Sequence, residues 1–241
     1  MPTRWDARQD SGQDSSQYSG QYSGPGTRRV ISDTRDIWDI SPPVSPATPP
    51  FPGDQAYEQR WTANLRPGCP VNLSAITMSP HVGAHADAPL HYANGAAPIG
   101  EVNLEPYLGV CRVIHAIDCG PLVQPQHLQH AARALPPRVL VRTCERAPTV
   151  WSAAFSAFAP QTIPWLASLG VRLVGIDSQS VDPADSKDLP SHQQLLAHDM
   201  RVLENLVLDH VPAGDYELIA LPLKLMQADA SPVRAILRRL P

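Results

Sequence analysis

The sequence lacks long apolar runs, an excess of positive charge and clustered cysteines, and each absence excludes a class of protein. No segment approaches the roughly 18 consecutive apolar residues that a membrane-spanning helix needs, and the first residues lack the apolar core of a secretory signal. A net charge of −4 provides no basic surface for nucleic acid or for an anionic membrane. We therefore expect a cytoplasmic protein that binds neither nucleic acid nor a membrane.

Cysteine is scarce and widely spread. The chain has four cysteines and no Cys-x-x-Cys pair. This spacing favours free thiols in a reducing compartment over disulfides or metal ligands. The residues concerned are Cys69, Cys111, Cys119 and Cys144.

The first 35 residues differ in composition from the rest of the chain. They contain the run QDSGQDSSQYSGQYSGPG, which has no aliphatic residue. Such a segment cannot bury enough apolar area to offset the entropy lost on ordering. We expect a disordered Gly/Ser/Gln-rich extension over 1–35 and one folded domain over 36–241.

The folded part alternates strand-like and short helix-like segments. Strands are expected at 37–40, 71–79, 107–117, 138–142, 171–176, 201–208 and 216–221, before a closing segment at 231–240. Helices are expected at 124–134, 160–169 and 191–198, the last with Ser191 as its N-cap. This order predicts a mixed α/β domain with a mostly β core and few short helices.

One short segment concentrates chemically capable side chains. Residues 81–91 read HVGAHADAPLH and contain His81, His85, Asp87 and His91. Imidazole and carboxylate are the ligands that zinc and similar metals prefer, and this density is hard to explain as packing. The prolines and the glycine argue against a helix, so we expect a tight loop whose small alanines let the backbone wrap closely around an ion. His81, His85 and Asp87 would supply three ligands, one short of a tetrahedral site.

The missing ligands must come from elsewhere in the chain. The best candidates are His192 and Glu204 in SHQQLLAHDMRVLENL, with His198 as the alternative to His192. On one straight helix the pair would lie about 18 Å apart, so the chain must reverse between them. From composition alone, a solvated helix face explains this pair more simply. The segment 175–183 (GIDSQSVDP) is interpreted as a strand end and a turn. The remaining histidines are assigned structural roles: His115, His127, His130 and His210.

Several motifs together resemble a known family. HVGAHADAPLH resembles the H-x-G-T-H-x-D-x-P-x-H signature of the metal-dependent cyclase/hydrolase family, with Ala84 where threonine is frequent. With the further motifs, the chain over about 36–241 resembles the bacterial kynurenine formamidases (arylformamidases). These motifs are WDIS-PP at 38–43, FPGD at 51–54, GIDSQSVDP at 175–183, LEN at 203–205, and YELIALPLK and ASPVRA near the C-terminus.

The resemblance implies a swivelling β/β/α-type hydrolase domain, a homodimer and a site for two metal ions. The ions are usually zinc, although manganese and cobalt are not distinguished. By motif position, His81, His85 and Asp87 would bind the first ion. Asp87 and Glu204 would bridge to a second ion, and His192 would complete its shell.

The implied reaction is hydrolysis of N-formyl-L-kynurenine to L-kynurenine and formate, in tryptophan degradation, by a metal-bound hydroxide. His91 would be the acid/base. Phe51 would lie against the aromatic ring of the substrate; it replaces a frequent tryptophan, which keeps the stacking face and loses the indole N–H. Two alternatives remain: another hydrolase of the same family, acting on an isatin-type cyclic amide, lactone or ester, and a metal-stabilised binding protein without turnover.

Overall fold

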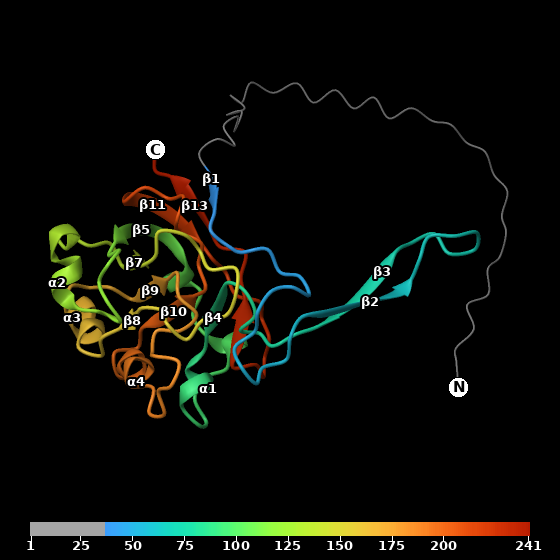
Figure 1. The fold of residues 1–241 in the computed structure, drawn as a ribbon, viewed down its shortest axis with the longest axis horizontal. Helices are drawn as coiled ribbons and strands as arrows, with labels where there is room; N and C mark the ends of the chain where they lie inside the picture. The colour runs from blue at the N-terminus through green and yellow to red at the C-terminus, as the bar shows by residue number, and fades with distance from the viewer. Residues whose placement is uncertain (1–36) are drawn as a thin grey trace, which may run out of the picture. The chain divides into compact units, whose positions relative to one another are not determined.

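A nine-stranded mixed sheet forms the centre of the structure (Figure 1). The computed structural model describes residues 37–241, so the extension predicted for 1–35 lies outside the described residues. The strands of this sheet are β1 (Ile37–Asp39), β4 (His85–Asp87), β5 (Leu108–His115), β7 (Arg138–Arg142), β9 (Leu173–Ile176), β10 (Arg201–Glu204), β11 (Gly214–Ile219), β12 (Ala230–Pro232) and β13 (Ile236–Arg239).

The spatial order of the strands is β1-β13-β11-β5-β7-β9-β10-β4-β12. β5, β7, β9 and β10 are parallel neighbours at the centre. The pairs on either side of them are antiparallel. β4 therefore lies between two strands although it is only three residues long.

Few and short helices accompany the sheet, which confirms the predicted mixed, mostly β fold class. The helices are α1 (Pro89–Tyr92), α2 (Pro125–Leu128), α3 (Thr162–Ser168) and α4 (Pro190–Ala197), with 3-10 turns η2 (Ile99–Glu101), η3 (Glu105–Tyr107) and η4 (Gln129–Ala131). Two small sheets pair β2 (Glu58–Ala63) with β3 (Leu73–Thr77) and β6 (Leu122–Val123) with β8 (Ala157–Phe158). No helix among residues 37–241 is long and apolar enough to cross a membrane.

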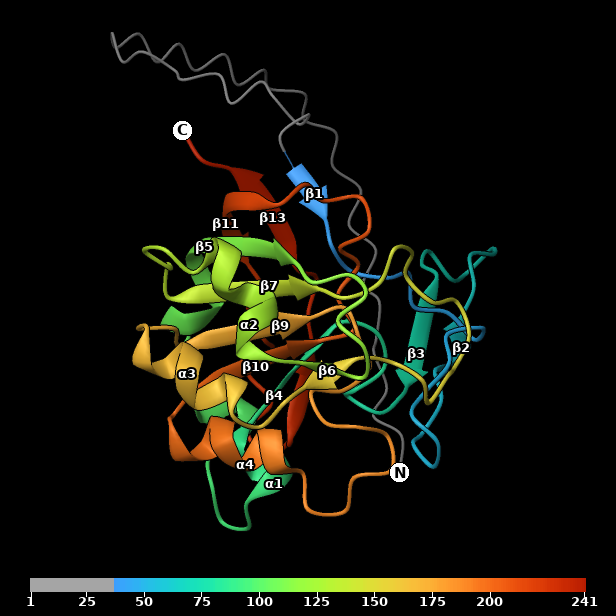
Figure 2. The same ribbon diagram turned by 60° about the vertical axis from the view of Figure 1, so that its left-hand side comes forward.

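The core divides into two clusters because side chains alternate along each strand. On β7, Leu140 belongs to one cluster, whereas Val139 and Val141 belong to the other. Leu166 of α3 and Leu195 of α4 complete the second cluster. Figure 2 shows α2, α3 and α4 together beside the sheet, so one face carries the helices.

Every predicted strand matches an observed strand, with ends shifted by a few residues. The strand predicted at 201–208 stops at Glu204, because Asn205 has a φ of 56°, in the left-handed region. The helix predicted at 124–134 is shorter than expected, since it divides into α2 and η4.

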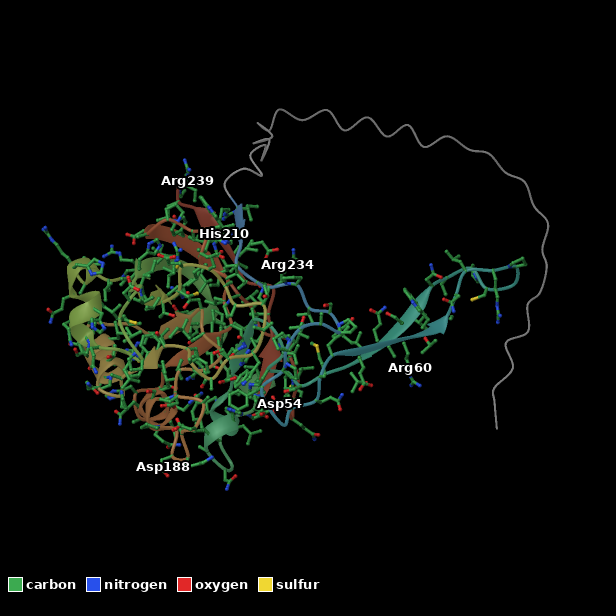
Figure 3. The ribbon with its side chains drawn as sticks, viewed as in Figure 1. Asp54, Arg60, Asp188, His210, Arg234 and Arg239 are labelled. Atoms are coloured by element: carbon green, nitrogen blue, oxygen red, sulfur yellow. The ribbon has the colours of Figure 1, made fainter. Side chains whose placement is uncertain are left out.

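The β2–β3 hairpin extends away from the nine-stranded sheet (Figure 1), with Arg60 along its length (Figure 3). Its apolar side chains are exposed: 57% for Trp61, 56% for Leu73 and 58% for Ile76. An isolated two-stranded hairpin is marginally stable in water. The hairpin therefore presents an apolar surface that its own unit leaves uncovered.

Candidate metal centre

The segment predicted as a metal-binding loop is a loop only in its first part. Residues 81–84 form turns and bends, whereas His85–Asp87 forms β4 and Pro89–Tyr92 forms α1. From His85 onward the loop prediction was wrong, for two reasons. β4 gains its hydrogen bonds from β10 and β12, which are distant in sequence. Pro89 takes the first helical position, where the missing N–H of proline costs nothing.

The alanines of this segment serve the core. His85 and Asp87 project from one face of β4, so Ala86 projects from the opposite face. Ala84, Ala86 and Ala88 are buried members of the first hydrophobic cluster. Their small size therefore allows close packing in the core. From the sequence alone, it was attributed instead to the backbone wrapping around an ion.

The register between β4 and β10 brings two functional segments together. His85 lies opposite Glu204 across this antiparallel pair. Directly opposed residues place their side chains on the same face of a sheet. His192 reaches the same face from α4, because the chain reverses between α4 and β10. The two segments that the sequence singled out therefore meet in space.

Three imidazole rings converge around two carboxylates. Atoms bound to one tetrahedral zinc at about 2.0–2.1 Å lie about 3.3 Å from one another. Asp87 Oδ1 lies 3.1 Å from His81 Nδ1 and 3.4 Å from His85 Nε2, and Glu204 Oε2 lies 3.3 Å from His85 Nε2. The other carboxylate oxygens, Asp87 Oδ2 and Glu204 Oε1, lie 3.4 and 3.6 Å from His192 Nε2. Each carboxylate thus faces His85 with one oxygen and His192 with the other, an arrangement that suits a pair of bridged cations.

Four buried atoms of this cluster lack ordinary hydrogen-bond partners. Among the described residues, these atoms are His85 Nε2, His192 Nε2 and both carboxylate oxygens of Asp87. Buried polar atoms are nearly always satisfied, and an exception requires an explanation. A bound cation would satisfy all four atoms, so the residues present fit a metal.

The surrounding carboxylates attract positive charge. Burial lowers the pKa of His81, but Asp229 and Asp87 outweigh it and raise this pKa to about 10. Burial likewise lowers the pKa of His192, while Asp182 and Asp87 raise it to about 10. Burial raises the pKa of Asp87, yet His192 and His81 hold it well below its usual range. The electrostatics of the cluster therefore favour cations over neutral occupants.

Each of the three clustered histidines has its second ring nitrogen held by an acceptor. His85 Nδ1 donates to the carbonyl oxygen of Gly83 at 2.9 Å. His192 Nδ1 donates to Asp182 Oδ2 at 2.7 Å. His81 Nε2 faces Asp229 Oδ2 at 3.0 Å. Such contacts fix the ring orientation and leave the other nitrogen for a metal.

Asp182 was not identified as a functional residue from the sequence. Its contacts also show that the predicted N-cap of α4 was wrong. Its Oδ1 accepts the N–H of Ser191 at 2.8 Å and its Oδ2 accepts the N–H of His192 at 3.0 Å. A carboxylate at a helix start satisfies free N–H groups and the helix dipole. Ser191 is therefore not the N-cap; Leu189 occupies that position without a side-chain cap. The first turn of α4 is anchored by a carboxylate from the loop after β9.

His91 lies on α1 beside the cluster. Its ring centroid is 4.4 Å from that of His81 and 5.9 Å from that of His192. One arrangement of His81, Asp87 and His91 also brings three ligand-type atoms within 4.8 Å of one another. Proximity alone therefore leaves His91 able to act as a ligand or as a neighbouring acid/base. Asp229, the second aspartate that the sequence did not reveal, lies 3.0 Å from His91 Nδ1.

The cluster forms part of the wall of a pocket of about 440 Å³. Phe51 and Trp151 line this pocket with an edge-to-face contact at 4.8 Å between ring centroids. Lys187 contributes an amine, and Gln179 has a buried side-chain oxygen without a hydrogen-bond partner among residues 37–241. Of these four, the sequence indicated Phe51 alone as a binding residue. The size and mixed lining are typical of small-molecule sites.

The fold and the donor set together define a class of protein. A mixed sheet that delivers histidine, aspartate and glutamate side chains to a pocket is typical of metal-dependent hydrolases. The family model described as "Putative cyclase" matches residues 38–183. The chain belongs to this Cyclase family.

Curated relatives are similar over nearly their whole length. The kynurenine formamidase of Bordetella petrii is 67% identical over 205 residues, which cover 85% of this chain and 98% of the relative. The kynurenine formamidase of Polaromonas naphthalenivorans is 66% identical over 207 residues, 86% of this chain and 92% of the relative.

Solved structures share the fold. A "predicted metal-dependent hydrolase from Bacillus stearothermophilus" is 27% identical, with a TM-score of 0.72 over 83% of this chain and 97% of its own. Isatin hydrolase A from Labrenzia aggregata is 20% identical, with a TM-score of 0.71 over 85% of this chain and 94% of its own. The second likeness shows the fold alone.

Asp182→Asn should reduce the free energy of unfolding by about 1–3 kcal/mol, because an amide cannot accept all three hydrogen bonds that the carboxylate receives. Denaturant unfolding followed by circular dichroism measures this loss. The exposed Asp188→Asn is the matched control and should stay within about 0.5 kcal/mol of the parent. Equal stability of the two variants would contradict the anchoring role of Asp182.

Proposed function

We propose that this protein is a cytoplasmic kynurenine formamidase that hydrolyses N-formyl-L-kynurenine to L-kynurenine and formate. The observation that carries the proposal is a buried His/Asp/Glu cluster in the wall of an aromatic pocket. It occurs in a chain 67% identical to curated kynurenine formamidases over 85% of its length. Isatin hydrolysis is the weaker alternative, because the likeness to isatin hydrolase A extends to the fold alone.

The proposed cofactor is a pair of zinc ions. His81, His85 and Asp87 would hold one ion, Asp87 and Glu204 would bridge to the second, and His192 would complete the site. When bound, such ions lower the pKa of water and polarise a carbonyl oxygen. The paired oxygens of the two carboxylates and the unsatisfied buried nitrogens support this assignment.

His91 would move the proton that the reaction requires. Water adds to the formyl carbon, the carbon–nitrogen bond breaks, and a proton must pass from the attacking water to the departing aniline nitrogen. His91 lines the pocket with 31% of its side chain exposed, so it can reach a bound substrate. Imidazole suits this role because its ordinary pKa lies near neutrality.

The pocket walls match the remaining parts of the substrate. Phe51 and Trp151 offer ring faces and edges to the aniline ring. Lys187 offers a positive charge to the amino-acid carboxylate, and the side-chain oxygen of Gln179 can accept a hydrogen bond from a substrate N–H. An amino-acid substrate with an aromatic ring therefore uses groups that a small neutral cyclic amide would leave idle.

The proposed assembly is a homodimer formed through the β2–β3 hairpin. Trp61 and Ile76 share one face of the hairpin, because Trp61 pairs with Ser74 and Gln59 pairs with Ile76. Both are more than half exposed. Covering them with a second copy removes apolar area from water and stabilises a hairpin that would be marginal alone.

The purified protein should hydrolyse N-formyl-L-kynurenine with a kcat/KM well above its values for isatin and simple esters. Absorbance of the arylamine product measures hydrolysis of the amides, and acid release in a pH-stat measures hydrolysis of the esters. A preference for isatin would instead support the alternative.

Lys187→Met should raise KM for N-formyl-L-kynurenine about tenfold, which is the equivalent of one charge-assisted hydrogen bond. The same variant should leave KM for formanilide unchanged in the same absorbance assay, since formanilide has no carboxylate.

Asp87→Ala should lose bound metal and turnover together, because both ion positions use this carboxylate. His91→Ala should keep its metal and lose about 100- to 10,000-fold in kcat. Metal analysis beside the kinetic assay separates the two variants. A metal-depleted His91→Ala protein would make His91 a ligand, and full activity of a chelator-treated parent would remove the metal mechanism.

Light scattering should give twice the 26.2 kDa chain mass for the parent protein. The double variant Trp61→Ser, Ile76→Ser should give the monomer mass, because it removes the apolar face of the hairpin. Arg60→Ser, on the opposite face, is the matched control and should remain dimeric. A dimeric double variant would place the interface elsewhere.

A further inference from the structure

Asp229 contacts two functional histidines through a single oxygen atom. Its Oδ2 lies 3.0 Å from His91 Nδ1 and 3.0 Å from His81 Nε2. A carboxyl group has an ordinary pKa of about 4, so Asp229 carries a negative charge at neutral pH. A charged carboxylate can only accept hydrogen bonds. Both imidazoles must therefore donate to it.

This contact determines which nitrogen of His91 is available for chemistry. Among the hydrogen bonds of the described residues, the ring of His91 is bonded to Asp229 alone. Donation from Nδ1 leaves Nε2 as the atom that can accept and release a proton. A partly exposed ring on a four-residue helix would otherwise rotate and change tautomer freely.

The sheet holds Asp229 in place. Its backbone oxygen accepts the N–H of Ala88 at 2.8 Å. The next residue, Ala230, pairs with Asp87 in the β12–β4 ladder. The strand that carries the candidate ligands His85 and Asp87 therefore also sets the position of the carboxylate. The backbone of Asp229 is therefore held beside β4 and α1 by these bonds.

We propose that Asp229 is a positioning residue for the reaction: it fixes the rotamer and tautomer of His91 and couples that ring to the candidate metal ligand His81. The inference rests on the proposed function and extends it. In this role Asp229 supplies no proton. It acts through the two rings, in the way that carboxylates outside a metal shell orient ligand histidines.

A double-mutant cycle tests the kinetic part of this proposal. On N-formyl-L-kynurenine at saturating zinc, Asp229→Ala should lower kcat about 100-fold with little change in KM, because proton transfer is impaired and substrate binding is not. In a His91→Ala background the same change should lower kcat less than about twofold. Asp229→Asn, which keeps one acceptor oxygen, should fall between the parent and Asp229→Ala. The exposed Asp188→Asn should match the parent.

Two further readouts do not depend on turnover. Nitrogen-15 NMR of the histidine rings should show the Nδ1–H tautomer of His91 in the parent and a mixture in Asp229→Ala. Competition with a chelator should show a 10- to 100-fold lower zinc affinity in Asp229→Ala, through the loss of support for His81.

The proposal is overturned if Asp229→Ala lowers kcat equally in both backgrounds, since Asp229 would then act independently of His91. It is also overturned if the His91 resonances are the same in the parent and in Asp229→Ala. A parent protein without formamidase activity would refute the proposed function alone; in that case the NMR and zinc measurements still decide whether Asp229 positions the two rings.

Discussion

The pairing of β4 with β10 is the contact on which the candidate site depends. Its register places His85 opposite Glu204 and keeps Asp87 on the same face. A slip of one residue would turn these side chains toward the opposite face, into the apolar cluster that Ala86 occupies. Two carboxylates buried this deeply would each cost several kcal/mol without a compensating charge. The imidazoles around them and the cations that their geometry suits supply that charge.

A second set of acceptors lies outside this cluster and makes it rigid. The carbonyl of Gly83 precedes β4, Asp182 follows β9, and Asp229 precedes β12. Each comes from a different part of the chain and holds the ring nitrogen that faces away from the carboxylates. The rings therefore keep their orientation before any ligand arrives, which is the condition for tight and specific metal binding. Asp182 also anchors the start of α4, so one carboxylate links helix stability to site geometry.

The groups proposed to recognise the substrate lie outside the nine-stranded sheet. Phe51, Trp151 and Lys187 belong to connecting segments around the pocket. Such segments change more readily than paired strands, so one scaffold can serve several substrates. Isatin hydrolase A shares the fold with this chain at 20% identity. The separation of pocket walls from sheet means that the metal signature alone indicates a family, and that the pocket walls are needed to argue for one substrate.

The sequence by itself determined the features that depend on near neighbours. The short apolar run in RVLVR predicted β7, and the spacing of His81, His85 and Asp87 singled out the cluster, because both patterns are local. It did not reveal β4 as a strand, since the hydrogen bonds that form β4 come from strands distant in the chain. Nor did it reveal Asp229, which lies 148 residues from His81 and 138 from His91.

Only one strand of the β2–β3 hairpin was predicted: β3 was expected from the sequence and β2 was not. β2 is exposed along almost its whole length and carries no apolar alternation that would indicate a buried face. Tertiary structure alone decided which acceptor each histidine would meet, because a side chain of ordinary type acquires its role from the charge and hydrogen-bonding groups that folding places around it. The local pattern specified which atoms could bind a metal; the strand pairing specified which of them meet.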